Sequence, residues 1–148
     1  MVHSFYNSSV ITYTATWDRD AVAADLEELN DDDYMLVEEF FDLIETNDRV
    51  CEALSCSRFV RLERPQFDTE PIQSALREGY NLSRAKIFDP AGRPLGCRVI
   101  YGVDHAPDNR RICILGVMKR DDDYDCSSPF GLRIRAAYDA RGLPRLDR

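Results

Sequence analysis

The sequence of 148 residues has little of what marks several special protein classes. Its seven glycines and seven prolines are too few for a collagen-like or low-complexity chain. No apolar run approaches the roughly 18 residues that a membrane-spanning helix needs, and the N-terminal segment lacks a basic start followed by an apolar stretch. We therefore expect a folded cytoplasmic protein that neither enters a membrane nor is exported.

Groupings of metal-binding and nucleotide-binding residues are also missing. The five cysteines are odd in number and follow no C-x-x-C spacing, which favours free thiols in a reducing compartment over a disulfide framework. Cys97 and Cys113 lie in apolar runs, where we expect them to be part of the core. The chain has two histidines, neither at zinc-site spacing, and no glycine-rich phosphate loop or G-x-S-x-G turn. We therefore expect no metal and no cofactor.

Basic residues are outnumbered, and the imbalance is concentrated in one half of the chain. The net charge is -8, from 19 Lys and Arg against 27 Asp and Glu, which argues against a uniformly basic surface for nucleic acid. Up to Glu78 the net charge is -12, whereas the remainder carries +4. If the protein has an anionic ligand, we therefore expect it to bind the C-terminal half, while the acidic half serves solubility or a basic partner.

The first half of the chain predicts one strand and two helices. Residues 10–17 alternate β-branched and aromatic side chains, which is typical of a strand, and Asp18 or Asp20 can cap the helix that follows. Apolar residues then recur at helical spacing twice, on either side of the turn at 30–33. The acidic triplet 31–33 is explained by the dipole at a helix start, which we favour over a metal site. The two apolar series are Val22, Leu26, Leu29 and Val37, Phe40, Phe41, Ile44.

The second half predicts a sheet. Residues 47–78 have only short apolar clusters, and we interpret them as an irregular insertion with one or two short helices. Three strands follow as an antiparallel meander, the last of them apolar on both faces as in a central strand, and a final helix covers 129–140. The strands are expected at 80–88, 97–104 and 111–119. The chain thus predicts a single α+β domain over residues 1–148, with a strand and helical hairpin packed on a mainly antiparallel sheet.

Three motifs in this half resemble one known family. GYNLSRAKI, CRVIYGVD and RRICILGVMKRDDDYD, within residues 79–125, are similar to the C-terminal strands of the RelE/ParE toxin superfamily. The resemblance implies a RelE/ParE-like fold and the toxin of a bacterial type II toxin–antitoxin pair. RelE-like members cleave mRNA in the ribosomal A site, and ParE-like members poison DNA gyrase. Arg98, the pair Lys119-Arg120 and Tyr124 resemble the RNA-cleaving branch more.

The residues can be assigned to the chemistry of metal-independent RNA cleavage. A 2′-hydroxyl must lose its proton and attack the adjacent phosphate, while the extra negative charge is stabilised and a base is held. Arg84 and Lys86 lie two apart on a strand and so share a face, which antiparallel pairing can bring near Arg98 and the basic end of the last strand. The candidate roles are a general base (Lys86), phosphate and transition-state clamps (Arg98, Arg120), a base-stacking platform (Tyr124), and further phosphate binding (Arg84, Lys119).

Other functions of the same fold stay open at this point. The resemblance implies a cognate antitoxin and mRNA on the ribosome as partners. Asp121 to Asp123 would repel phosphate, so a protein that acts by binding alone, such as a ParE-like gyrase inhibitor, is the alternative, with a non-toxic relative as a third. The insertion at 47–78 comes immediately before the basic strand, and we hypothesise that it partly covers the pocket or forms the antitoxin-binding surface.

Overall fold

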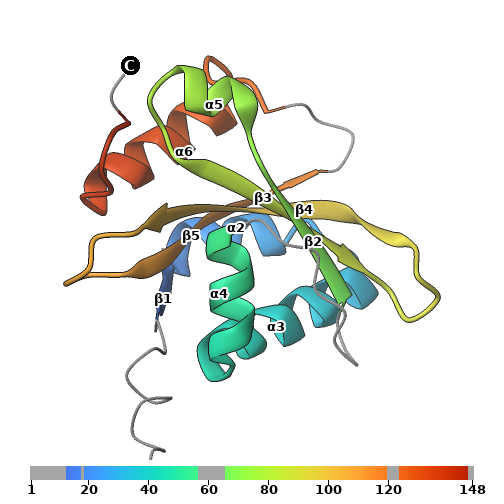
Figure 1. Cartoon of the computed structure of the whole chain (residues 1–148). Helices are drawn as coiled ribbons and strands as arrows, with labels where there is room; N and C mark the ends of the chain where they lie inside the picture. Colours follow the sequence, from blue (N-terminus) through green and yellow to red (C-terminus); the bar gives the residue numbers. More distant parts are fainter. Residues whose placement is uncertain (1–12, 18, 57–65, 120–123, 147–148) are drawn as a thin grey trace, which may run out of the picture.

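Five strands and five helices make up the part of the chain that the structure, a computed structural model, describes: residues 13–17, 19–56, 66–119 and 124–146. The strands form one sheet, with helices on both of its faces (Figure 1). In chain order the elements are β1 (Thr14–Trp17), α2 (Arg19–Leu26), α3 (Asp31–Thr46), α4 (Asp48–Cys56), β2 (Gln66–Pro71), α5 (Gln73–Arg77), β3 (Leu82–Phe88), β4 (Pro94–Asp104), β5 (Arg111–Lys119) and α6 (Pro129–Ala140).

The sheet is mixed, with strand order β1-β5-β4-β3-β2. Strands β2 to β5 are consecutive antiparallel neighbours, whereas β1 lies beside β5 and runs parallel to it. The expected meander of three strands is therefore confirmed as β3, β4 and β5. Strand β5 has a neighbour on each side, and its residues 112–118 are all buried, as the apolar sequence of a central strand predicts.

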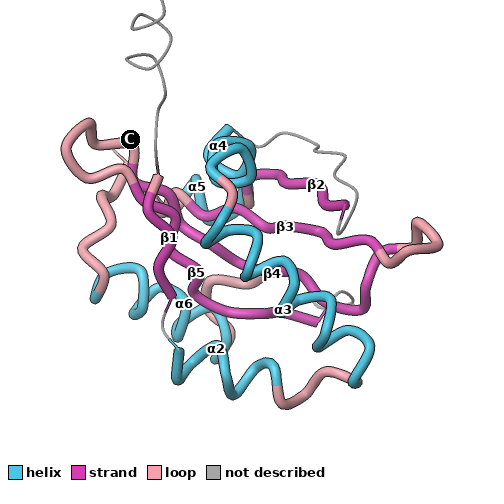
Figure 2. Tube along the Cα trace, turned by 90° about the horizontal axis from the view of Figure 1, so that it is seen from below, coloured by secondary structure: helices cyan, strands magenta, loops and turns pink. Residues whose placement is uncertain are grey.

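Two hydrophobic clusters lie on the opposite faces of the sheet. Helices α3 and α4 cover one face, and α5 and α6 cover the other (Figures 1 and 2). The first cluster, the α3-side core, includes Phe40, Phe67 and Tyr101, and the Tyr101 hydroxyl donates to the Leu54 carbonyl oxygen at 2.8 Å. The second, the α6-side core, includes Tyr80 and Tyr138. As expected, Cys97 and Cys113 are buried, one in each cluster.

The two N-terminal helices form where the apolar spacing predicts them. Val22 and Leu26 of α2 are buried, as are the four apolar positions of α3. The Asn30 side chain caps α3 by accepting from the backbone N–H of Asp33 at 2.8 Å, so the acidic triplet opens the helix as expected. Of the predicted first strand, residues 14–17 form β1, while 10–12 and the candidate cap Asp18 lie outside the described residues.

The segment 47–78 contains the short helices that the sequence predicts, but it also contains a strand that corrects its interpretation as an irregular insertion. It contains α4 and α5 and, between them, β2, a fifth strand that pairs along β3 from Gln66 to Pro71. The sequence QFDTEP alternates side chains between the faces: Phe67 and Thr69 are buried on one, and Asp68 and Glu70 lie on the other. We missed the strand because six residues that end in proline give a weak strand pattern.

Helix α2 closes the open edge of β5 beyond the end of β1. The Asp25 carboxylate accepts from the backbone N–H of Val117 at 2.8 Å, and Arg133 of α6 donates to both of its oxygens at 2.7 and 2.9 Å. Asp25 thus joins α2, β5 and α6 and occupies a strand edge that would otherwise be open. No helix in the described ranges is long and apolar enough to cross a membrane.

Candidate functional site

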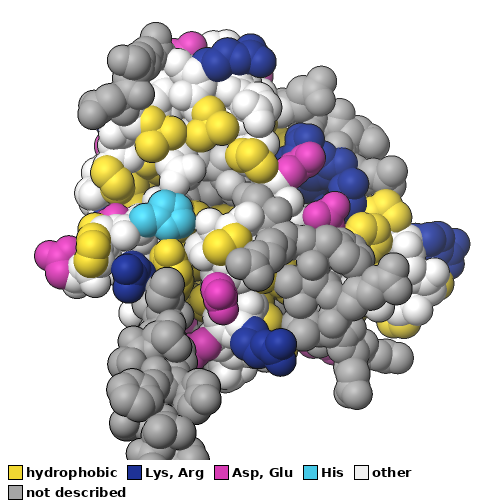
Figure 3. All heavy atoms as spheres, viewed as in Figure 1, with side chains coloured by type: hydrophobic (Ala, Val, Ile, Leu, Met, Phe, Trp, Pro, Cys, Tyr) yellow, Lys and Arg dark blue, Asp and Glu magenta, His cyan; other side chains and the backbone are white. Residues whose placement is uncertain are grey.

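Three of the basic residues singled out in the sequence share one surface. Lys86 of β3 pairs directly with Arg98 of β4, and Arg84 lies two residues from Lys86 on the same face. We call Arg84, Lys86 and Arg98 the basic cluster. Basic and acidic side chains lie side by side over this part of the sheet in Figure 3. The cluster belongs to the face that α5 and α6 cover, beyond the end of the α6-side core.

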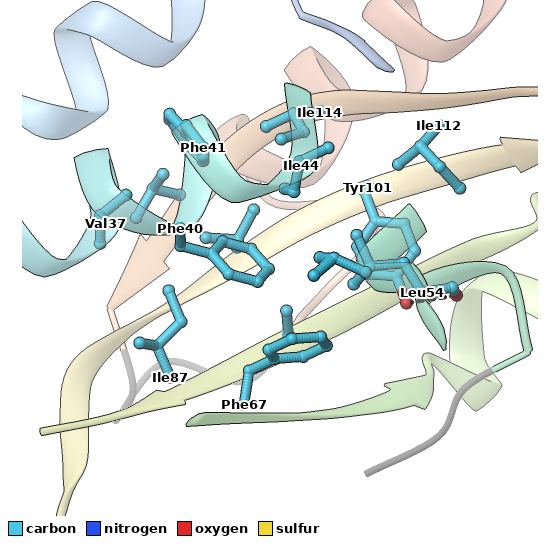
Figure 4. Close-up of a cluster of buried hydrophobic side chains, with 14 of the residues drawn as sticks. Val37, Phe40, Phe41, Ile44, Leu54, Phe67, Ile87, Tyr101, Ile112 and Ile114 are labelled. Carbon is cyan, nitrogen blue, oxygen red and sulfur yellow. Dashed lines mark hydrogen bonds between the residues drawn. The ribbon is translucent and has the colours of Figure 1, made fainter. Parts of the chain in front are cut away.

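The alternation of side chains along the strands explains this position. Ala85 and Ile87 point into the α3-side core, so their neighbours Arg84 and Lys86 must point to the other face. In the same way Cys97 and Val99 are buried on either side of Arg98. Figure 4 shows Ile87 and Phe67 pointing toward Phe40 of α3. The apolar partners therefore determine where the cations lie.

Two carboxylates from β2 lie within the basic cluster. The register places Asp68 beside Lys86 and Glu70 beside Arg84. Arg84 donates its Nε–H to Glu70 Oε1 at 2.6 Å, and a second guanidinium nitrogen pairs with the same oxygen. These five side chains line a hollow of about 10 Å³, which has room for no more than one water molecule. Glu70 therefore competes with a phosphate for Nε and one terminal nitrogen of Arg84.

The remaining predicted site residues do not join this surface. Lys119 pairs with Cys97, whose side chain is in the α3-side core, and directly paired residues share a face of the sheet. Lys119 therefore lies on the face opposite to the basic cluster, with its Nζ 3.8 Å from Glu28. Tyr124 is 8% exposed and packs in the α6-side core, which corrects our expectation of a base-stacking platform, because a base needs an open ring face. Burial raises the pKa of the Tyr124 phenol. Arg120 lies outside the described residues.

Sequence reasoning missed Asp68 and Glu70. The signal was present, because two carboxylates alternate with Phe67 and Thr69 in the way expected of a half-buried strand. The larger grooves of the molecule lie elsewhere: one of about 920 Å³ lies where α2, the end of β5 and the start of α6 meet. In the described residues no three His, Cys, Asp or Glu side chains are grouped so as to hold a metal ion.

Chemically, the basic cluster can bind and neutralise a phosphodiester. Guanidinium groups donate in a planar fork that matches two phosphate oxygens, and an amine can accept or supply a proton. With Asp68 and Glu70 included, three cations face two carboxylates, so the local charge is only slightly positive. The site is therefore suited to an anion that competes with internal carboxylates.

Comparison with known proteins identifies no relative of this chain. Scans against protein-family models, curated proteins and solved structures all found no match to the chain. The resemblance to RelE/ParE toxins is therefore a prediction that rests on the motifs of residues 79–125.

Proposed function

We propose that this protein is the toxin of a bacterial type II toxin–antitoxin pair and cleaves mRNA on the ribosome without a metal ion. The observation that supports the proposal is the basic cluster, in which strand register aligns Lys86 with Arg98 and keeps Arg84 on the same face. A cognate antitoxin is its protein partner, and mRNA in the ribosome is its substrate.

In the proposed reaction the 2′-hydroxyl of one nucleotide attacks the phosphorus of the next phosphodiester. Lys86 acts as the general base that takes the hydroxyl proton, a new P–O2′ bond forms, and the P–O5′ bond breaks. The products are a 2′,3′-cyclic phosphate and a 5′-hydroxyl, whose proton is supplied by Lys86 or by water. Arg84 and Arg98 stabilise the additional negative charge on the phosphoryl oxygens while the bonds are exchanged.

A protein of the same fold that acts by binding alone is the second candidate. The observation that favours it is the pair of carboxylates within the basic cluster, because Glu70 already holds Arg84. A carboxylate at the position of the scissile phosphate opposes RNA binding by charge. A gyrase inhibitor of the ParE kind needs a complementary surface and no phosphate pocket.

Expression of variants without an antitoxin tests both candidates. Growth is followed, and transcript 5′ ends are mapped across the genome, after induction of the wild type and of an Arg84→Ala, Arg98→Ala double variant. The matched control is Arg77→Ala, Arg93→Ala, which removes two exposed arginines from outside the basic cluster. Thermal unfolding of the purified variants establishes that each one is folded.

The outcomes separate the hypotheses. Growth arrest with codon-phased cuts that disappear in the cluster variant and persist in the control supports the endoribonuclease. Arrest with intact transcripts rules out cleavage and supports the binding protein. Unimpaired growth on expression of the folded wild type rejects the toxin function altogether.

A further inference from the structure

A second surface, on the acidic half of the chain, has the properties of a binding groove. It lies between α2 and α3, on the face of the sheet opposite to the basic cluster, and has a volume of about 310 Å³. Its floor is apolar, since Val22, Leu26 and Phe41 are buried there. Trp17 stacks on Phe41 with ring centroids 5.3 Å apart. We call it the α2–α3 groove.

The rim of the α2–α3 groove carries three carboxylates. Tyr34, Glu38 and Asp42 follow each other at four-residue spacing on α3 and so form one stripe, and Glu27 faces them from the end of α2. Within the described ranges none of the three carboxylates has a cation within 4.0 Å. Glu38 and Asp42 are like charges four residues apart on one helix, so they repel each other, and no ion pair among the described residues offsets this repulsion.

The groove already shows which kind of group its aromatic wall accepts. The Arg19 guanidinium carbon lies 5.2 Å from the centre of the Trp17 ring, a cation–π distance. Tyr34 is 42% exposed at the same groove and offers a further aromatic surface. The groove is lined by three carboxylates and one cation, Arg19, so its net charge is negative. An aromatic wall with an acidic rim is complementary to a cation on an aliphatic stem.

We propose that the α2–α3 groove binds an arginine side chain of a basic segment in a partner protein. The guanidinium lies among Glu27, Glu38 and Asp42, and its aliphatic stem packs on Tyr34. Tyr34, which is 42% exposed at the groove, also offers apolar contact, which a peptide with neighbouring leucines uses better than a simple polyamine does. This proposal does not depend on RNA cleavage or on the basic cluster.

The chain contains an internal reporter for this test, because Trp17 is its only tryptophan. The full-length protein is titrated with an acetylated, amidated twelve-residue peptide of alanine and leucine with three arginines at helical spacing. The same peptide with citrulline in place of arginine is the ligand control, and spermine tests charge alone. The groove variant is Glu38→Gln, Asp42→Asn, and its matched control is Glu39→Gln, Glu45→Gln, which removes two exposed carboxylates of α3 that do not line the groove.

We expect the arginine peptide to cause a saturable change in Trp17 fluorescence. The groove variant should bind this peptide about tenfold more weakly than the wild type, and the control variant should bind it within about twofold of the wild type. Tyr34→Ala should also weaken binding, although it leaves the charge unchanged. Equal losses of peptide affinity in the groove and control variants would show that the peptide is attracted only by the overall negative charge of α3, and would overturn the proposal. Absence of saturation, or spermine binding as tightly as the peptide, would overturn it too.

Discussion

The junction at Asp25 allows a quantitative prediction for the substitution Asp25→Ala. The change removes the acceptor of the Val117 N–H and the bidentate partner of Arg133. A hydrogen bond to a charged acceptor contributes about 1.5–3 kcal/mol. The ion pair adds about 1 kcal/mol or less, because the Arg133 side chain is 34% exposed and water screens it. Together these contributions predict a loss of about 2–4 kcal/mol in the free energy of unfolding.

Urea denaturation followed by circular dichroism measures this loss. With a slope of about 2 kcal/mol/M for a domain of this size, the midpoint should fall by about 1–2 M. Glu28→Ala is the matched control, since Glu28 follows the same helix and its contact with Lys119 is exposed and 3.8 Å long. Arg133→Met should fall between the two, because Asp25 keeps the Val117 hydrogen bond. An Asp25→Ala midpoint equal to that of Glu28→Ala would refute the idea that Asp25 holds the sheet edge.

Three further predictions concern the site, the backbone and the thiols. Glu70→Gln should release Arg84 and tighten the binding of inorganic phosphate about threefold or more in a calorimetric titration, and unchanged affinity would contradict the view that Glu70 competes with phosphate. Gly131→Ala should cost more than about 2 kcal/mol in urea unfolding, because its Cβ would lie 1.9 Å from a backbone carbonyl oxygen of the preceding turn. Burial, with a smaller contribution from a nearby aspartate, raises the pKa of Cys97 to about 12, so the folded state keeps this thiol neutral. Its contribution to stability is full below the ordinary thiol pKa near 9.0 and is lost as the pH rises toward 12. At pH 8 iodoacetamide should therefore label the exposed Cys56 but spare Cys97 until urea unfolds the chain, and early labelling of Cys97 would be inconsistent with its burial.

The sequence predicts an element well where its own periodicity decides the structure. Helix α6 begins at Pro129 and ends at Ala140 as expected, because a serine cap and a proline mark its start. Residues 112–118 of strand β5 are apolar and are buried on both faces of the sheet. Strand β2 escaped prediction because its six residues become a strand through pairing with β3, an interaction between distant segments that no local pattern reports.

The part of the candidate site that follows from local spacing could also be predicted, whereas the part that depends on distant contacts could not. The two-residue spacing of Arg84 and Lys86 is enough to put them on one face, and the pairing of Lys86 with Arg98 follows once β3 and β4 form a hairpin. The position of Lys119 on the other face depends on the register shift between Ile100 and Tyr101, which spacing cannot reveal. The burial of Tyr124 depends on packing against residues distant in sequence, such as Tyr80, which local spacing cannot reveal.

The parallel pairing of β1 with β5 has a consequence for how the protein folds during synthesis. Thr14 pairs with Arg111, so the first strand must wait for a partner translated about 100 residues later. At typical elongation rates this delay lasts about 5–20 s. Throughout it, the apolar faces of α2 and α3 have no complete sheet to cover them. Contacts this distant in sequence slow folding, and nascent chains halted before β5 should be open to proteases and to chaperones.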